Sequence, residues 1–181
     1  HDREEFFGRT RSGVLQRLVE FLAILVCQCA QRFLEQIVLA NTNAGRLVFS
    51  SDLSAAIFDA EVVFIAVGTP PNEDGSADLS HVLAVAKSIG QAIQHPIVVV
   101  NKSTVPVGTA NKVNEALKKE LAQRGADFDF DVVSNPEFLR EGSVVQDFLY
   151  PDRIVIGADN PKSERVMEEL YGSFSKKQDR I

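Results

Sequence analysis

The sequence predicts an α/β fold in which helices flank a parallel sheet, and two observations support this prediction. Short apolar runs of strand length alternate with segments whose apolar residues recur at helical spacing. Strands buried on both faces and separated by helices of about ten or more residues indicate β-α-β units, which build parallel sheets. Because the 181 residues contain no internal repeat or linker, we expect one domain.

The predicted elements follow one another from residue 61 onward. Four segments have the composition of buried strands: Glu61–Val67, Pro96–Val100, Phe128–Val133 and Arg153–Gly157. Three segments have helical spacing of apolar residues: Leu79–Ile93, Gly108–Arg124 and Pro161–Tyr171. Asp78 is placed to cap the start of the first helix, and Gly125 is placed to end the second.

Residues 1–33 differ from the rest of the chain. Apolar residues between Val14 and Val26 fit one face of a helix, and nothing in the segment has the pattern of a strand. We expect residues 1–33 to be helical or poorly ordered, and residues 34–181 to form the domain. The apolar run Phe21–Cys27 is far shorter than the roughly 20 residues of a membrane helix. Since Glu20 adjoins it and no clear cleavage site follows, a signal peptide is not expected.

Charge and cysteine content exclude several classes of partner. A net charge of −6 and a pI near 5.1 argue against binding to nucleic acid or to an anionic membrane. Cys27 and Cys29 are too close for an easy disulfide and no other cysteine is present, so we expect free thiols and a cytoplasmic protein. Without further cysteines or suitably spaced histidines, no metal site is expected. The three histidines, His1, His81 and His95, are expected on the surface.

Three loops lie beyond the carboxyl ends of the predicted strands, where parallel sheets bind their ligands. These loops are Gly68–Asp78, Lys102–Gly108 and Ser134–Gly142. In the first, Gly68 permits close backbone approach and Thr69 offers a hydroxyl to a phosphate or ribose, although a rigid turn without a ligand is the alternative. In the second loop, Lys102 is followed by the hydroxyls of Ser103 and Thr104, and Thr104 could hydrogen-bond a water or a ligand. The spacing alone slightly favours the alternative, in which Lys102 is solvated and the two hydroxyls cap a helix.

The third loop holds two carboxylates, Glu137 and Glu141, four residues apart and beside Arg140. On a helical turn this spacing places both carboxylates on one side, where one of them could act on a water. The alternative is a solvated first turn of a helix, where carboxylates suit the helix dipole. Without a further signal, the residues alone favour this second interpretation.

Four ordered motifs resemble the nucleotide-sugar dehydrogenases, and most closely their UDP-glucose branch. The motifs are Val67–Leu79, Lys102–Thr109, Asn135–Gly142 and Pro151–Gly157. The segments Asp74–Asp78 and Pro151–Arg153 are more similar to the UDP-glucose branch than to the GDP-mannose or UDP-N-acetylmannosamine branches. The resemblance runs from about Leu34 nearly to the C-terminus. It implies a Rossmann-like NAD-binding domain.

The resemblance also implies an activity and a set of site residues. Such enzymes oxidise UDP-glucose to UDP-glucuronate, a polysaccharide precursor, using two NAD in succession and a cysteine thioester that water hydrolyses. The residues implied to contact NAD are Val67, Thr69, Ser103, Thr104 and Glu141. Thr104 would position a water near the nicotinamide, and Glu137 would help to activate the hydrolytic water. The residues implied to contact the sugar nucleotide are Glu137, Phe138, Leu139 and Arg140.

Partners follow from the same resemblance. UDP-glucose is the implied substrate, intact relatives are homo-oligomers, and no nucleic acid or membrane is implied. Two alternatives stay open. One is a non-catalytic module that binds a nucleotide or pairs with an intact subunit; the other is a sibling dehydrogenase that acts on GDP-mannose.

The sequence departs from the family pattern near its start. The family opens with a strand and a Gly-x-Gly-Tyr-Val-Gly turn that cradles the NAD pyrophosphate, whereas Gly8 and Gly13 stand isolated here. The Rossmann-like sheet is therefore expected to be incomplete, without a recognisable first strand and glycine-rich turn. Because the resemblance is lost within a few residues of Gln31, a joined or shifted reading frame is favoured. From this chain alone we expect no turnover and at most weak NAD binding.

Overall fold

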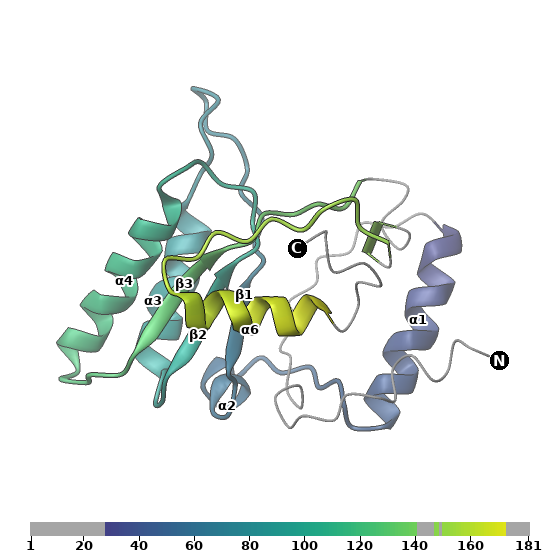
Figure 1. Cartoon of the computed structure of the whole chain (residues 1–181), viewed down its shortest axis with the longest axis horizontal. Helices are drawn as coiled ribbons and strands as arrows, with labels where there is room; N and C mark the ends of the chain where they lie inside the picture. Colours follow the sequence, from purple (N-terminus) through teal and green to yellow (C-terminus); the bar gives the residue numbers. More distant parts are fainter. Residues whose placement is uncertain (1–27, 141–146, 149, 173–181) are drawn as a thin grey trace.

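The computed structural model describes residues 28–140, 147–148 and 150–172 (Figure 1). Its sheet contains three parallel strands that lie side by side in chain order: β1 (Val62–Ile65), β2 (Ile97–Asn101) and β3 (Phe130–Ser134). In this register Val99 lies between Val63 and Val132. The predicted parallel sheet with flanking helices is therefore confirmed. Within the described residues no strand precedes β1.

The three predicted helices are present, with ends shifted by at most one residue. They are α3 (Ser80–Ala92), α4 (Thr109–Gln123) and α6 (Pro161–Gly172). The N-cap residue of α3 is Leu79 and not the expected Asp78, which lies one residue earlier and accepts a hydrogen bond from the Ser80 amide at 2.8 Å through its Oδ1 atom. Gly125 follows α4 with a φ of +65°, the left-handed conformation that glycine adopts at the end of a helix.

Two helices were not expected from the pattern. Helix α1 (Gln28–Asn43) crosses the expected boundary at residue 34, and its sequence lacks an acidic residue in its first turn. Helix α2 (Leu53–Ile57) is only five residues long and begins where Asp52 accepts a hydrogen bond from the Ala55 amide at 3.1 Å. The helix expected between Val14 and Val26 lies outside the described residues.

Two apolar clusters hold the helices on opposite faces of the sheet, and Figure 1 shows α6 on the other side of the sheet from α3 and α4. The first cluster joins one face of β1 and β2 to α2, α3 and α4, and it includes Ile65, Val99 and Leu117. The second joins the other face to α6 through Val100, Val133, Met167 and Leu170. Strand β2 is thus covered on both faces, as in a β-α-β sheet.

The strand expected over Arg153–Gly157 is not formed. The segment meets β3 in a single antiparallel bridge, where Gly157 and Ser134 exchange two hydrogen bonds of 2.8 Å. Two residues earlier, the Val155 carbonyl accepts a hydrogen bond from the Asn135 side chain, not from a backbone amide. The apolar pattern of the segment has another cause, because Ile154 and Ile156 pack in the cluster beneath α6.

Candidate functional site

The first and second loops are joined at the carboxyl ends of β1 and β2. The hydroxyl of Ser103 accepts a hydrogen bond from the Val67 amide at 2.9 Å and lies 2.7 Å from the Val67 carbonyl oxygen, to which it donates. The hydroxyl of Thr69 donates to the Thr104 carbonyl at 2.9 Å. Because β1 and β2 are neighbours, four residues predicted to contact NAD come together: Val67, Thr69, Ser103 and Thr104.

Thr104 and Ser103 present their hydroxyls differently. Ser103 is buried and its hydroxyl is engaged by the backbone at the end of β1, so it supports Val67 instead of facing solvent. Thr104 is exposed, and its hydroxyl has no hydrogen-bond partner within the described part of the chain. An exposed hydroxyl at this edge of the sheet can bind a water or a ligand. Neither residue caps α4, which begins after Gly108.

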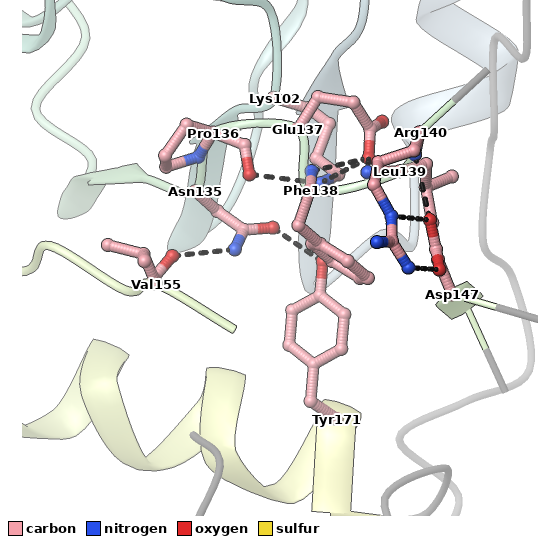
Figure 2. Close-up of polar contacts among 10 residues, drawn as sticks. All are labelled: Lys102, Asn135, Pro136, Glu137, Phe138, Leu139, Arg140, Asp147, Val155 and Tyr171. Carbon is pink, nitrogen blue, oxygen red and sulfur yellow. Dashed lines mark hydrogen bonds and ion pairs between the residues drawn. The ribbon is translucent and has the colours of Figure 1, made fainter. Parts of the chain in front are cut away.

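Lys102 joins the second loop to the third (Figure 2). Its Nζ atom lies 3.3 Å from the Pro136 carbonyl oxygen, 3.4 Å from Oε1 of Glu137 and 4.5 Å from the centre of the Phe138 ring. Only 15% of the side chain is exposed, so the interpretation of Lys102 as a solvated lysine is wrong. Burial lowers the pKa of Lys102, and the Glu137 carboxylate offsets part of this effect.

The third loop does not form the helical turn expected from the spacing of its carboxylates. Residues 135–140 are not helical, and Oε1 of Glu137 accepts hydrogen bonds from the Phe138 amide at 2.8 Å and the Leu139 amide at 3.0 Å. Glu137 thus binds the amides that follow it, an alternative to helical hydrogen bonding that polar side chains offer the backbone. Glu141 lies outside the described residues.

Arg140 pairs with Asp147 and, within the described residues, forms no hydrogen bond or ion pair with Glu137. The guanidinium binds both carboxylate oxygens, with Nη2 2.6 Å from Oδ1 and Nε 3.0 Å from Oδ2. The Arg140 amide donates to Oδ2 at 2.9 Å. This carboxylate raises the pKa of Arg140, which stays charged. Asp147 is buried, so it anchors the end of the loop against the protein.

A buried side chain fixes the start of the third loop. Asn135 is fully buried; its Nδ2 atom donates to the Val155 carbonyl at 2.8 Å, and its Oδ1 atom accepts a hydrogen bond from the Tyr171 hydroxyl at 2.5 Å. The Tyr171 ring also meets the Phe138 ring edge-on, with centroids 6.3 Å apart. Helix α6 therefore positions the loop, as Figure 2 shows.

Sequence patterns missed three residues of this arrangement. Tyr171 and Asp147 carry no local motif, and Tyr171 lies 36 residues from Asn135 along the chain. His81 is exposed as expected, but its Nδ1 atom lies 3.3 Å from the Gly68 carbonyl oxygen, beside the first loop. His95 is partly buried, whereas His1 is not described. The one available signal was the position of His81 in the first turn of α3, directly after a motif loop.

The geometry at this edge of the sheet suits part of a dinucleotide. A Cβ atom added to Gly68 would meet no heavy atom within 4 Å, so the backbone there is open to a ligand. Thr104 adds an exposed hydroxyl, of the kind that binds ribose or amide groups. The glycine-rich turn that would hold a pyrophosphate is not among the described residues. Fold and site together define a dinucleotide-binding α/β domain.

The chain belongs to the UDP-glucose/GDP-mannose dehydrogenase family. The NAD binding domain of that family matches residues 15–175, a range that begins within the segment 1–33. The chain is 51% identical over 148 residues to the UDP-glucose 6-dehydrogenase of Pseudomonas aeruginosa, a match covering 82% of the chain and 33% of the relative. It is 48% identical over 141 residues to the UDP-glucose 6-dehydrogenase of Rhizobium meliloti, covering 76% and 31%. The chain thus spans about a third of the length of these relatives.

Solved structures give the same family. A UDP-glucose dehydrogenase from Pyrobaculum islandicum superposes with a TM-score of 0.70 at 41% identity, covering 78% of this chain and 33% of that one. A ternary complex of the GDP-mannose dehydrogenase from Pseudomonas aeruginosa gives a TM-score of 0.74 at 32% identity, covering 84% and 35%. The fold and the NAD cofactor expected from the four motifs are therefore confirmed.

The described residues contain no group of three or more histidine, cysteine or acidic residues arranged to hold a metal ion. None of the described helices has the length and apolar character needed to cross a membrane.

Proposed function

We propose that this chain is the NAD-binding part of a UDP-glucose 6-dehydrogenase. The observation that carries the proposal is the meeting of the three motif loops at one edge of the sheet, through the Thr69–Thr104 bond and the Lys102–Glu137 contact. The identity of 51% to a UDP-glucose 6-dehydrogenase supports the choice of substrate. The oxidation itself is proposed for the whole protein, since the chain spans about a third of its relatives.

The proposed reaction converts the primary alcohol of UDP-glucose to the carboxylate of UDP-glucuronate. For each molecule, two hydrides leave the substrate carbon, one water adds its oxygen, and three protons are released. NAD, when bound, accepts one hydride in each of the two oxidations. The residues of this chain have the tasks of binding, orienting and handling protons.

The NAD side of the site is assigned to the first two loops. Thr69 and Thr104 supply side chains at the open edge, and the Thr104 hydroxyl positions a water near the nicotinamide. Val67 contacts the cofactor through its backbone. Ser103 acts on the cofactor through Val67, because its buried hydroxyl is hydrogen-bonded to the Val67 backbone. Glu141 is proposed as a further contact on this side.

The substrate side is assigned to the third loop. Glu137 is proposed as the base for the hydrolytic water, and its side chain is 40% exposed, so a water can reach it. The backbone of Phe138, Leu139 and Arg140 is proposed to contact the sugar nucleotide. The buried hydrogen bond between Tyr171 and Asn135 holds the start of this loop in place.

A GDP-mannose dehydrogenase is the second candidate. The TM-score of 0.74 with a GDP-mannose dehydrogenase favours it, although the identity there is 32% against 51% for a UDP-glucose relative. The shared fold explains the superposition, because both branches build the same sheet. The choice between them depends on which nucleotide sugar the third loop selects.

Calorimetric titration of the purified 181-residue chain tests the proposal. We expect measurable affinity for UDP-glucose, at least tenfold weaker affinity for GDP-mannose (about 1.4 kcal/mol) and weak affinity for NAD. We expect no NADH to form when NAD and UDP-glucose are supplied together. Preference for GDP-mannose would favour the second candidate, and binding of neither nucleotide sugar would favour a subunit-pairing module.

A further inference from the structure

We propose that Lys102 is a positioning residue for Glu137, anchoring one carboxylate oxygen so that the other faces the hydrolytic water. The chemical role given to Lys102 rests on the proposed function. The contact between Lys102 and Glu137 is a property of the chain by itself. Lys102 and Glu137 come from different loops, 35 residues apart, so their contact is not a consequence of local sequence.

The two oxygens of Glu137 have different surroundings. Oε1 lies within hydrogen-bonding distance of three donors: the Phe138 amide at 2.8 Å, the Leu139 amide at 3.0 Å and Lys102 Nζ at 3.4 Å. Oε2 has no hydrogen-bond partner among residues 28–140, 147–148 and 150–172. With 40% of the side chain exposed, Oε2 is the oxygen that a water can approach.

Lys102 contacts other residues of the third loop besides the Glu137 carboxylate. Its Nζ atom also lies 3.3 Å from the Pro136 carbonyl oxygen and 4.5 Å from the centroid of the Phe138 ring, so it contacts three successive residues of the third loop. At 3.4 Å the contact with Glu137 is longer than a short charge-assisted hydrogen bond. The cation therefore acts through the sum of its contacts, each of which limits how the loop can move.

This arrangement has a chemical purpose. A glutamate on the surface has many rotamers, and a base works well only when it is held close to the proton that it removes. Anchoring Oε1 reduces these rotamers without using the second oxygen. Lys102 itself does not touch the reacting atoms in this scheme.

Amide exchange measured by NMR on the 181-residue chain, without any nucleotide, tests the inference. Lys102→Met is expected to speed exchange of the Phe138 and Leu139 amides by about 2- to 12-fold, the effect of weakening one hydrogen bond. Lys102→Arg should restore slow exchange, because it keeps the cation. Lys118→Met, at an exposed lysine of α4, is the matched control and should leave both amides unchanged.

A second readout keeps the inference testable if Lys102→Met does not fold. In Glu137→Gln, the pKa of Lys102, followed by NMR of its side chain, should fall further because the neighbouring carboxylate charge is lost. An unchanged pKa in this variant, or amide exchange in Lys102→Met equal to that of the control, would overturn the inference. Neither of these measurements uses a nucleotide. A failure of UDP-glucose binding would therefore refute the proposed function without changing the amide exchange rates or the pKa of Lys102.

Discussion

Replacing Tyr171 by phenylalanine removes one hydroxyl from the buried support of the third loop. In the structure this hydroxyl donates to Oδ1 of Asn135 at 2.5 Å, and Asn135 is fully buried. Phenylalanine keeps the ring that meets Phe138 edge-on, so the packing between the rings is retained. The substitution therefore isolates the hydrogen bond from the ring contact.

The expected cost follows from the buried acceptor left behind. A buried polar group that loses its partner costs about 1–3 kcal/mol. For a domain of this size, 1 kcal/mol corresponds to a shift of roughly 2–4 °C in Tm, so a fall of about 2–12 °C is expected. Tyr171 is 6% exposed, so water has little access to replace the lost donor.

Urea unfolding followed by far-UV circular dichroism measures this cost. Fluorescence is less suitable, because the chain has no tryptophan and only two tyrosines. Tyr150→Phe is the matched control, since Tyr150 is 53% exposed and should tolerate the same change within about 0.5 kcal/mol. If Tyr171→Phe loses no more free energy of unfolding than Tyr150→Phe, the role of Asn135 as a buried support is refuted.

Three further predictions concern packing, protonation and cofactor binding. Gly90→Ala should lower the free energy of unfolding by about 1–3 kcal/mol, because its Cβ would lie 2.9 Å from a side-chain carbon of α4; Gly172→Ala, with open space around it, should not. Burial lowers the pKa of Lys102 below 10.5, so the unfolded chain binds more protons between the folded pKa and 10.5. The free energy of unfolding of the parent chain, relative to that of Lys102→Met, should then rise with pH across that window. Parallel pH profiles of the two free energies would contradict this. Thr104→Val should weaken NAD binding by about 2- to 12-fold, the effect of one hydrogen bond, whereas Thr42→Val should not; equal affinities of the two variants in calorimetry would count against Thr104.

Much of the fold could be predicted because its signals are local. Each strand of the sheet is a short apolar run, and the three helices that cover it show helical spacing over three or more turns. Arg153–Gly157 has a strand-like composition for another reason, since Ile154 and Ile156 pack beneath α6. Composition cannot separate these two causes. Helix α2 was missed because five residues are too short for a period to appear.

The meeting of the three loops at one edge of the sheet was predicted, but the contacts between them were not. The rule for parallel sheets located the three loops correctly, since it depends only on strand order and direction. The role of Lys102 could not be predicted, because its burial depends on Pro136 and Phe138 from a loop more than thirty residues away. The helical turn expected at Glu137 is not formed, for a related reason. The side chain binds the amides that follow it, which spacing alone does not reveal.

The central claim is that the three motif loops form one site for UDP-glucose and NAD. Its most direct test is to map amide shifts of the 181-residue chain by two-dimensional NMR during titration with each compound. We predict that UDP-glucose shifts the amides of Phe138, Leu139 and Arg140, and that NAD at high concentration shifts those of Thr69 and Thr104. Shifts confined to residues outside these loops, or no shifts with either compound, would contradict the claim.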